Sequence, residues 1–310
     1  MTTKLMDQVD PGQSTAAKPG YVIITPARNE AAFLEQTIQS VVAQNWQPLR
    51  WVIVSDGSTD GTDEIVARYA KEYGWIELLR MPERKERHFA GKVHAFNAGY
   101  ERVKPLPYEF ICSLDADITF EADYFEFLLK RFAENLRLGV GGTPFYEAGK
   151  AYNYSFTSEE HVSGACQLFR RECFEAIGGY VPLRAGGIDL AAVLTARMKG
   201  WQTRSFTQKR CEHHRVMGTA KHGPLMICYK GGYHDYLMGG HPVWQLFRSV
   251  YQMSRSPLVI GGCVLLAGYL WAAVTRAEKI VSPELVQFRR KEQMRRLRGF
   301  LGKRLLLRRG

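Results

Sequence analysis

Cysteine is scarce in this chain, and none of its six cysteines forms a Cys-x-x-Cys pair. Structural zinc sites and disulfide frameworks depend on paired or regularly spaced cysteines, so we expect neither of them here. Several of the cysteines lie within apolar runs, where a free cysteine acts as a small hydrophobic residue. This usage predicts a reducing, cytoplasmic compartment.

We also expect neither a secretory signal nor a clear membrane span. Residues 1–19 are polar and rich in small side chains, and we expect a disordered lead-in there. Residues 257–274 carry no charge, but 18 residues are at the lower limit for a spanning helix, and three glycines weaken it. This stretch can re-enter the membrane, lie in the interface, form a hairpin with residues from 242 onward, or pack as a buried helix.

The net charge of +11 is concentrated at the C-terminal end, because residues 276–310 hold twelve Lys or Arg against three Asp or Glu. Such a tail suits an acidic surface, and aromatic residues between 229 and 251 are typical of a membrane interface. We therefore expect residues 224–310 to form membrane-associated helices with a basic amphipathic tail, on the cytoplasmic face of the cell membrane. A core helix followed by a solvated charged tail is the alternative.

Short apolar runs alternate with segments of helical spacing across the first 135 residues. This alternation predicts an α/β domain over residues 20–223, with a mostly parallel sheet between flanking helices. After residue 139 the pattern is less regular, and there we expect a strand, a short helix, a longer helix and an edge strand. The expected strands are 21–25, 51–55, 76–81, 110–114, 164–169 and 201–206; the expected helices include 31–44, 91–100, 171–177 and 188–199.

An acidic triplet, Asp115-Ala116-Asp117, follows the apolar run that ends at Leu114. Ligands of open α/β sheets bind at the carboxyl ends of the strands, where these two carboxylates are expected. Mg²⁺ or Mn²⁺ prefers oxygen ligands and commonly shares them with substrate phosphates. The triplet therefore indicates a metal that holds a diphosphate, although the same pattern can simply cap a helix.

Two other strand ends carry polar residues of the same kind. Pro26-Ala-Arg-Asn-Glu30 follows the first strand, and Ser55-Asp-Gly-Ser58 follows the second. In a doubly wound sheet these ends and the acidic triplet can converge on one crevice. Taken alone, Asp56 reads equally well as the side chain of a tight turn.

With these motifs the chain resembles the bacterial-type, non-processive members of glycosyltransferase family 2, which have the Rossmann-like GT-A fold. The resemblance covers about 170 residues in the order of the family. The matching segments are Ile24-Thr-Pro-Ala-Arg-Asn-Glu30, Val54-Ser-Asp-Gly-Ser-Thr-Asp-Gly-Thr62, Gly91-Lys-Val-His-Ala-Phe-Asn-Ala-Gly99, Leu114-Asp-Ala-Asp117, Ser163-Gly-Ala-Cys-Gln-Leu-Phe-Arg-Arg171 and Ile177-Gly-Gly-Tyr180.

The resemblance implies a nucleotide-sugar donor and a divalent metal, Mg²⁺ or Mn²⁺, on the second acid of the triplet, Asp117. It also implies a set of donor-binding residues, among which Lys92 suits a diphosphate as a point charge but can equally be a solvated lysine. The implied donor-binding residues are Pro26, Arg28, Glu30, Asp56, Lys92, Asn97 and Asp115.

One departure from the family concerns the contact with the base of the nucleotide. Many relatives have two acids where this chain has Ser55-Asp56, so Asp56 or Glu30 would take over the contact of the first acid.

On the acceptor side, the resemblance places the catalytic base at Asp189, although relatives often have Glu-Asp where this chain has Ile188-Asp189. The plain alternative is that Asp189 caps the helix that follows. Downstream, His213-His214-Arg215 offers an imidazole for the metal, for which we favour His214, and Arg215 for a phosphate. A surface histidine pair without function is the alternative.

The sequence therefore predicts a metal-dependent, inverting hexosyltransferase of polysaccharide biosynthesis. It would move a sugar from a nucleoside diphosphate to a hydroxyl of a lipid-linked or polysaccharide acceptor. The Gln-x-x-Arg-Trp signature of processive polymerases is absent, which favours transfer of a single sugar. A polyprenyl-phosphate sugar synthase is the first alternative, and a non-catalytic basic protein that binds membranes or nucleic acid is the second. We do not expect nucleic acid as a partner.

Overall fold

A computed structural model describes residues 18–83, 89–147, 150–151, 158–215 and 223–306, so most of the expected lead-in lies outside the described residues. The described residues form two sheets. The larger contains β1 (Tyr21–Ala27), β2 (Arg50–Asp56), β3 (Ile76–Met81), β4 (Phe110–Leu114), β6 (Leu138–Gly142), β9 (Cys166–Arg170) and β10 (Gln202–Ser205). The smaller contains β5 (Ile118–Thr119), β7 (Phe145–Glu147), β8 (Lys150–Ala151) and β11 (Cys211–His213).

The larger sheet has seven strands in the order β10-β6-β9-β4-β1-β2-β3. Its neighbouring strands run parallel except β9, which is antiparallel to both β4 and β6. The prediction of a mostly parallel α/β sheet is therefore confirmed, and β10 lies at the edge as expected. An apolar run indicates that a strand is buried but does not indicate its direction. The antiparallel direction of β9 was therefore not predicted from the sequence.

Alternating strand residues face two different layers of helices. Tyr21 and Ile23 of β1 face one core with α1, α2 and α4, whereas Val22 and Ile24 face the other with α3, α5 and α6. Gly99 allows α3 to lie close to the sheet, since a Cβ there would come within 2.7 Å of Ile24. These helices are α1 (Leu34–Val42), α2 (Thr62–Glu72), α3 (Ala90–Val103), α4 (Tyr124–Glu134), α5 (Arg171–Ala176) and α6 (Ile188–Met198).

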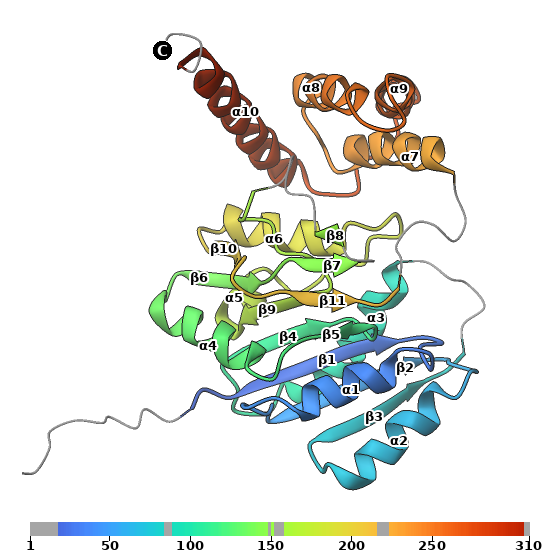
Figure 1. The fold of residues 1–310 in the computed structure, drawn as a ribbon, viewed down its shortest axis with the longest axis vertical. Helices are drawn as coiled ribbons and strands as arrows, with labels where there is room; N and C mark the ends of the chain where they lie inside the picture. The colour runs from blue at the N-terminus through green and yellow to red at the C-terminus, as the bar shows by residue number, and fades with distance from the viewer. Residues whose placement is uncertain (1–17, 84–88, 148–149, 152–157, 216–222, 307–310) are drawn as a thin grey trace, which may run out of the picture.

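Four helices follow at the end of the molecule opposite α2 and β3 (Figure 1): α7 (Pro224–Leu237), α8 (Pro242–Met253), α9 (Ile260–Val274) and α10 (Pro283–Leu306). α7 and α9 cross at two glycines, Gly232 and Gly268, where an added Cβ would meet backbone oxygens of the other helix at 1.8 and 2.1 Å. Among the described residues, none of the helices combines the length and apolar character that a bilayer crossing requires. At 15 residues α9 is about 22 Å long, shorter than a hydrocarbon core of about 30 Å.

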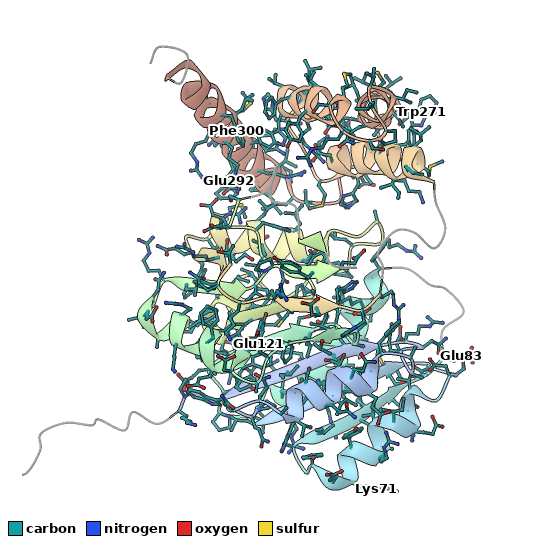
Figure 2. All side chains as sticks on the ribbon, in the orientation of Figure 1. Lys71, Glu83, Glu121, Trp271, Glu292 and Phe300 are labelled. Atoms are coloured by element: carbon teal, nitrogen blue, oxygen red, sulfur yellow. The ribbon has the colours of Figure 1, made fainter. Side chains whose placement is uncertain are left out.

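The first half of α10 is packed against the rest of the protein. Figure 2 shows Glu292 in the half of α10 that is nearer to the two sheets. Its carboxylate accepts two hydrogen bonds from Arg197 of α6, at 2.8 and 2.9 Å, and both side chains are less than a tenth exposed. Arg289 donates at 2.7 Å to Asp235 of α7. Arg289 and Glu292 of the tail are therefore buried in contacts with α7 and α6 rather than facing solvent.

Candidate functional site

The polar residues expected to converge lie at the carboxyl ends of three adjacent parallel strands. Arg28 and Glu30 follow β1, Asp56 is the last residue of β2, and Asp115 directly follows β4. Pro26 pairs in register with Val54 near the end of β1. Because β4, β1 and β2 are neighbours in the sheet, these ends share one edge.

Hydrogen bonds hold the loops after β1 and β2 together. The backbone N–H of Asn29 donates to Ser58 Oγ at 3.1 Å, and Asn29 Oδ1 accepts from the N–H of Thr59 at 2.8 Å. The N–H of Glu30 donates to Thr62 Oγ1 at 2.9 Å. Asn29 is left-handed (φ 58°), a conformation that asparagine tolerates better than most residues. These hydrogen bonds thus fix the backbone position of Glu30.

Arg215 links two of the expected site residues. Its Nη2 pairs with Glu30 Oε2, and its Nε lies 3.3 Å from Asp117 Oδ2. Nearby, Arg28 Nη1 lies 4.0 Å from Asp56 Oδ2. The structure therefore brings these five residues together in two ion-pair groups at the strand ends.

The imidazole beside Asp117 belongs to His213, not to the favoured His214. His213 Nε2 lies 3.6 Å from Asp117 Oδ1, and its buried Nδ1 lies 3.3 Å from Glu147 Oε2 without the geometry of a hydrogen bond. His214 is exposed and pairs with Thr119 at 2.8 Å. Successive side chains at the end of a strand point to opposite faces, so only one of the two histidines can face the acid.

A divalent cation fits the chemistry of this place. Asp117 is 7% exposed and supplies a carboxylate, and His213, 9% exposed, supplies an imidazole nitrogen. Among the described residues, no group of three or more His, Cys, Asp or Glu is arranged as a closed metal cage. Mg²⁺ and Mn²⁺ need no such cage, because one or two carboxylates, substrate phosphates and water commonly complete their coordination. Asp117 and His213 would hold the ion here.

A cavity of about 300 Å³ opens beside these residues, and its lining includes Lys92, Asp115, Asp189 and His213. Lys92 Nζ donates a hydrogen bond to Asp115 Oδ1. An ammonium and carboxylates from separate elements thus face one space. Its size lies at the lower end of small-molecule sites.

The charges of the Lys92–Asp115 pair depend on each other. Burial disfavours the charged form of Lys92, but the carboxylates of Asp115, Asp189 and Asp117 outweigh it and raise the lysine pKa. Burial raises the pKa of Asp115, and repulsion from Asp117 adds to it, against the attraction of Lys92. Lys92 therefore keeps a positive charge at neutral pH within the cavity.

Asp189 lies in the first turn of α6 and lines the cavity. The N-cap of α6 is Gly187 (φ 82°), so Asp189 is not the capping residue. Its side chain packs against Gly164, where an added Cβ would lie 3.0 Å from Asp189 Cβ. The glycine in the Ser163-Gly164 segment therefore leaves space for this acid.

Asn97 is not brought together with the other expected site residues. It is exposed and lines a separate hollow on the outer side of α3, together with Glu101, Lys104 and Phe174. Asn97 follows Lys92 by five residues, which places it about 140° further around the helix. Both side chains cannot face the same cavity, and Lys92 is the one that does.

Two residues at the site were not foreseen from the sequence. His161 lines the cavity beside Asp189, and Glu147 faces His213. Both lie in the stretch after residue 139, where the strands are short and the periodicity is weak. A single histidine or glutamate in such a stretch carries no signal that sequence reasoning can use.

Comparison with known proteins gives a family for most of residues 20–223. The model of glycosyl transferase family 2 matches residues 22–182. A poly-beta-1,6-N-acetyl-D-glucosamine synthase of Staphylococcus epidermidis is 28% identical over 130 residues, covering 40% of this chain and 28% of that protein. The synthase of Staphylococcus aureus strain COL is 27% identical over 126 residues, with the same coverage. The chain thus matches less than a third of the length of these relatives.

Solved structures with the same fold include a mannosyltransferase and a complex of TarS. The mannosyltransferase PcManGT of Pyrobaculum calidifontis, in complex with GDP-Man and Mn²⁺, is similar with a TM-score of 0.58 at 18% identity, covering 87% of this chain and 78% of that one. S. aureus TarS 1-349 in complex with UDP-GlcNAc has a TM-score of 0.53 at 14% identity, covering 81% and 71%. These similarities show the GT-A fold.

Proposed function

The chain belongs to glycosyl transferase family 2, and on that basis we propose that it transfers one sugar from a nucleoside diphosphate to a hydroxyl of a lipid-linked or polysaccharide acceptor. One observation carries this proposal. Lys92, Asp115 and Asp189 line one cavity, with the Asp117 group at its side. The relatives include polymer synthases, but the matched part covers 28% of their length, so acceptor and product are proposals for this chain.

The donor side of the cavity suits a diphosphate. When bound at Asp117 and His213, a divalent cation would neutralise charge on the leaving diphosphate. Lys92 adds a second positive charge, which its carboxylate neighbours maintain. Arg28, Glu30 and the other residues at the ends of β1 and β2 would hold the nucleoside.

Asp189 is the proposed general base. The acceptor oxygen forms a bond to the anomeric carbon while the bond from that carbon to the diphosphate oxygen breaks, and the hydroxyl proton passes to the Asp189 carboxylate. Attack from the face opposite the leaving group inverts the anomeric configuration. Asp189 lines the same cavity as Lys92, which is the arrangement that such a step requires.

The test is titration calorimetry with a panel of nucleotides in the presence of Mn²⁺, followed by turnover of the nucleotide sugar that binds. We expect Asp117→Ala to abolish Mn²⁺-dependent nucleotide binding. Asp189→Ala should bind nucleotide normally and lose transfer by a factor of about 10²–10⁴. The matched control is Glu121→Ala, which removes a carboxylate that is 70% exposed. Full transfer by the Asp189 variant, or no nucleotide binding by the wild type, would contradict the proposal.

We further propose that the protein is peripheral to the cytoplasmic face of the membrane through α7, α8 and α9. Of the 17 exposed large hydrophobic residues in the part of the chain that the structure describes, 12 lie between residues 225 and 274. Figure 2 shows Trp271 at the outer edge of α9. A concentration of exposed apolar side chains is typical of a surface that meets protein or membrane, and the basic tail favours anionic lipid.

A further inference from the structure

The turn before α6 contains two glycines in the left-handed conformation, Gly186 (φ 89°) and Gly187 (φ 82°). Glycine adopts this conformation at little cost. The carbonyl oxygen of Gly187 accepts a hydrogen bond from the N–H of Ala191 at 2.9 Å, which belongs to the first turn of α6. Asp189 lies in the same turn of the helix. The position of the two glycines therefore sets the position of the backbone that carries the Asp189 carboxylate.

Two ring side chains from distant parts of the chain pack against these glycines. A Cβ at Gly186 would lie 3.4 Å from the ring of Phe89, which immediately precedes α3. A Cβ at Gly187 would lie 2.9 Å from Cε1 of His234 in α7, which is closer than packed carbon atoms come. The absence of a side chain at Gly187 therefore lets α7 lie directly against the turn.

His234 also forms a hydrogen bond with the turn. Its Nε2 lies 3.2 Å from the carbonyl oxygen of Gly186. A carbonyl oxygen only accepts, so Nε2 carries the hydrogen and donates it. Met238, buried at the end of α7, adds to the packing, because its Sδ would lie 3.2 Å from a Cβ at Gly187. A hydrogen bond and close packing thus join α7 to the turn that precedes Asp189.

The turn stands between two cavities. One is the cavity of about 300 Å³ that Lys92 lines, which we call the donor cavity, and the other is a cavity of about 400 Å³ between α6 and the C-terminal helices. Gly187 and Asp189 line both of them, and His234 lines the second. The space on the side of α7 leaves room for the turn to shift away from the donor cavity. The hydrogen bond from His234 opposes that shift.

We propose that His234 is a positioning residue, which holds the turn through Gly186 so that Asp189 faces the donor cavity. The inference rests on the proposed transferase function, in which Asp189 is the general base. Among the described residues, the lining of the donor cavity does not include His234, so the imidazole would act through the backbone and not on the substrate. A shift of about 1 Å in a catalytic group can cost roughly 10²-fold in rate, which one hydrogen bond can therefore control.

The experiment measures hydrolysis of UDP-glucose, UDP-N-acetylglucosamine and GDP-mannose in the presence of Mn²⁺, followed by release of the nucleoside diphosphate. Water replaces the acceptor hydroxyl in this reaction, and its proton passes to Asp189. We expect His234→Leu to lower kcat by about 10- to 100-fold. The KM of the donor should stay within about twofold of the wild type, because the residues proposed to bind the donor are unchanged.

Two conservative variants separate the hydrogen bond from packing. His234→Gln can place an N–H near the position of Nε2, and we expect its kcat to stay within about threefold of the wild type. His234→Asn is too short to reach Gly186 and should lose as much as His234→Leu. If the leucine variant does not fold, the comparison of the two amide variants carries the test.

His241→Leu is the matched control. It removes another imidazole of the C-terminal helices, whose Nδ1 accepts a hydrogen bond from the N–H of Val243 at the start of α8. This variant loses a helix cap but no contact with the turn at Gly186, so we expect wild-type kcat. An equal loss in His241→Leu and His234→Leu would assign the effect to general loosening of these helices.

A double-mutant cycle tests whether His234 acts through Asp189. In the background of Asp189→Asn, we expect His234→Leu to lower the remaining hydrolysis by less than about threefold, since the carboxylate to be positioned is already gone. A full further loss in that background would contradict the proposal. Wild-type kcat in His234→Leu would also contradict it, as would equal losses in His234→Gln and His234→Leu. A higher donor KM with unchanged kcat would place His234 in donor binding instead.

The same measurements separate this failure from a failure of the proposed function. If Asp189→Asn hydrolyses the donor slowly but His234→Leu behaves like the wild type, the transferase stands and the positioning role is wrong. If Asp189→Asn keeps full activity, or if the wild type neither binds nor hydrolyses a nucleotide sugar, the proposed function fails and the role of His234 fails with it.

Discussion

Arg215 Nε lies 3.3 Å from Asp117 Oδ2, so a guanidinium stands beside the carboxylate that we propose as a metal ligand. The same side chain pairs with Glu30 through Nη2. The positive charge of Arg215 beside Asp117 opposes the binding of a metal cation to that carboxylate, unless the arginine turns away. A donor diphosphate would let the arginine turn away, because phosphate oxygens also accept two parallel hydrogen bonds from a guanidinium.

The first prediction is that Arg215→Gln binds Mn²⁺ more tightly than the wild type when no nucleotide is present. Loss of one charge-assisted contact, about 1.5 kcal/mol, corresponds to roughly a tenfold change in the dissociation constant. The measurement is electron paramagnetic resonance of free Mn²⁺ during a titration. Arg210→Gln is the control, since Arg210 is 58% exposed and pairs with Glu212 instead. Equal Mn²⁺ affinity of both variants would show that Arg215 does not compete with the metal.

A second prediction concerns the buried pair between α6 and α10. Glu292→Ala leaves the Arg197 guanidinium, whose side chain is 9% exposed, without its bidentate carboxylate. We expect the free energy of unfolding to fall by about 3–5 kcal/mol, measured by urea denaturation. Glu284→Ala, at an exposed position in the first turn of α10, should change it by less than about 0.5 kcal/mol. If both variants unfold at the same urea concentration, α10 does not depend on this pair.

Much of the larger sheet could be predicted because its strands are buried on both faces. Runs such as Val52-Ile-Val54 read as strands whatever their neighbours are, and the polar residues that follow them mark the strand ends. The smaller sheet could not be predicted in this way. Its strands have two or three residues, too few to show a period, and their pairing joins β5 with β11 across more than 90 residues.

The same limit applies to the site. Asp115 and Asp117 were predicted because the end of a strand is visible in the sequence, and Lys92 was predicted by the resemblance to the family. The choice between His213 and His214 depends on which face of β11 meets Asp117, and this follows only from the pairing of the short strands. Asn97 was placed with the donor by resemblance, and the rotation of α3 puts it elsewhere.

A third prediction compares two adjacent glycines in α7. Gly232→Ala would place a Cβ 1.8 Å from the Leu265 oxygen of α9, whereas at Gly231 the nearest atom is a Leu265 methyl carbon at 3.5 Å. We expect Gly232→Ala to destabilise the packing of α7 on α9 by about 1–3 kcal/mol. Gly231→Ala should be neutral or slightly stabilising, since alanine favours helix. Thermal unfolding followed by circular dichroism measures the difference, and equal melting temperatures would show that the helices do not cross at Gly232.

The fourth prediction is a dependence of stability on pH through His161. Burial lowers the pKa of His161, against the opposing effect of the Asp189 carboxylate. Below a pH of about 6.5 the unfolded state therefore binds this proton more readily than the folded state, and stability falls as the pH falls.

The loss for this one group is at most about 1.4 kcal/mol per pH unit. The loss of stability is measured as the change of the denaturation midpoint between pH 7.5, 6.5 and 5.5. We expect His161→Gln to lose less stability on acidification than the wild type. His94→Gln, which removes an exposed histidine of α3, should keep the wild-type slope. Parallel curves for His161→Gln and the wild type would contradict the burial of a neutral imidazole.

The last prediction tests the proposed membrane surface at Trp271. Its side chain is 57% exposed on α9, with Leu270 beside it at 50%, so replacing it changes little inside the protein. Trp271→Glu removes apolar area that would enter the lipid interface and adds a charge that anionic lipid repels. We expect binding to vesicles that contain phosphatidylglycerol to weaken by roughly thirtyfold, which corresponds to about 2 kcal/mol.

Co-sedimentation with such vesicles measures this change, and Leu136→Glu is the matched control. Leu136 is 76% exposed between α4 and β6, far along the chain from the C-terminal helices, so its variant should bind vesicles like the wild type. If Trp271→Glu also binds like the wild type, the exposed residues of α9 do not meet lipid. Raising the salt concentration then separates the contributions, because screening weakens the attraction of the basic tail but not the burial of Trp271.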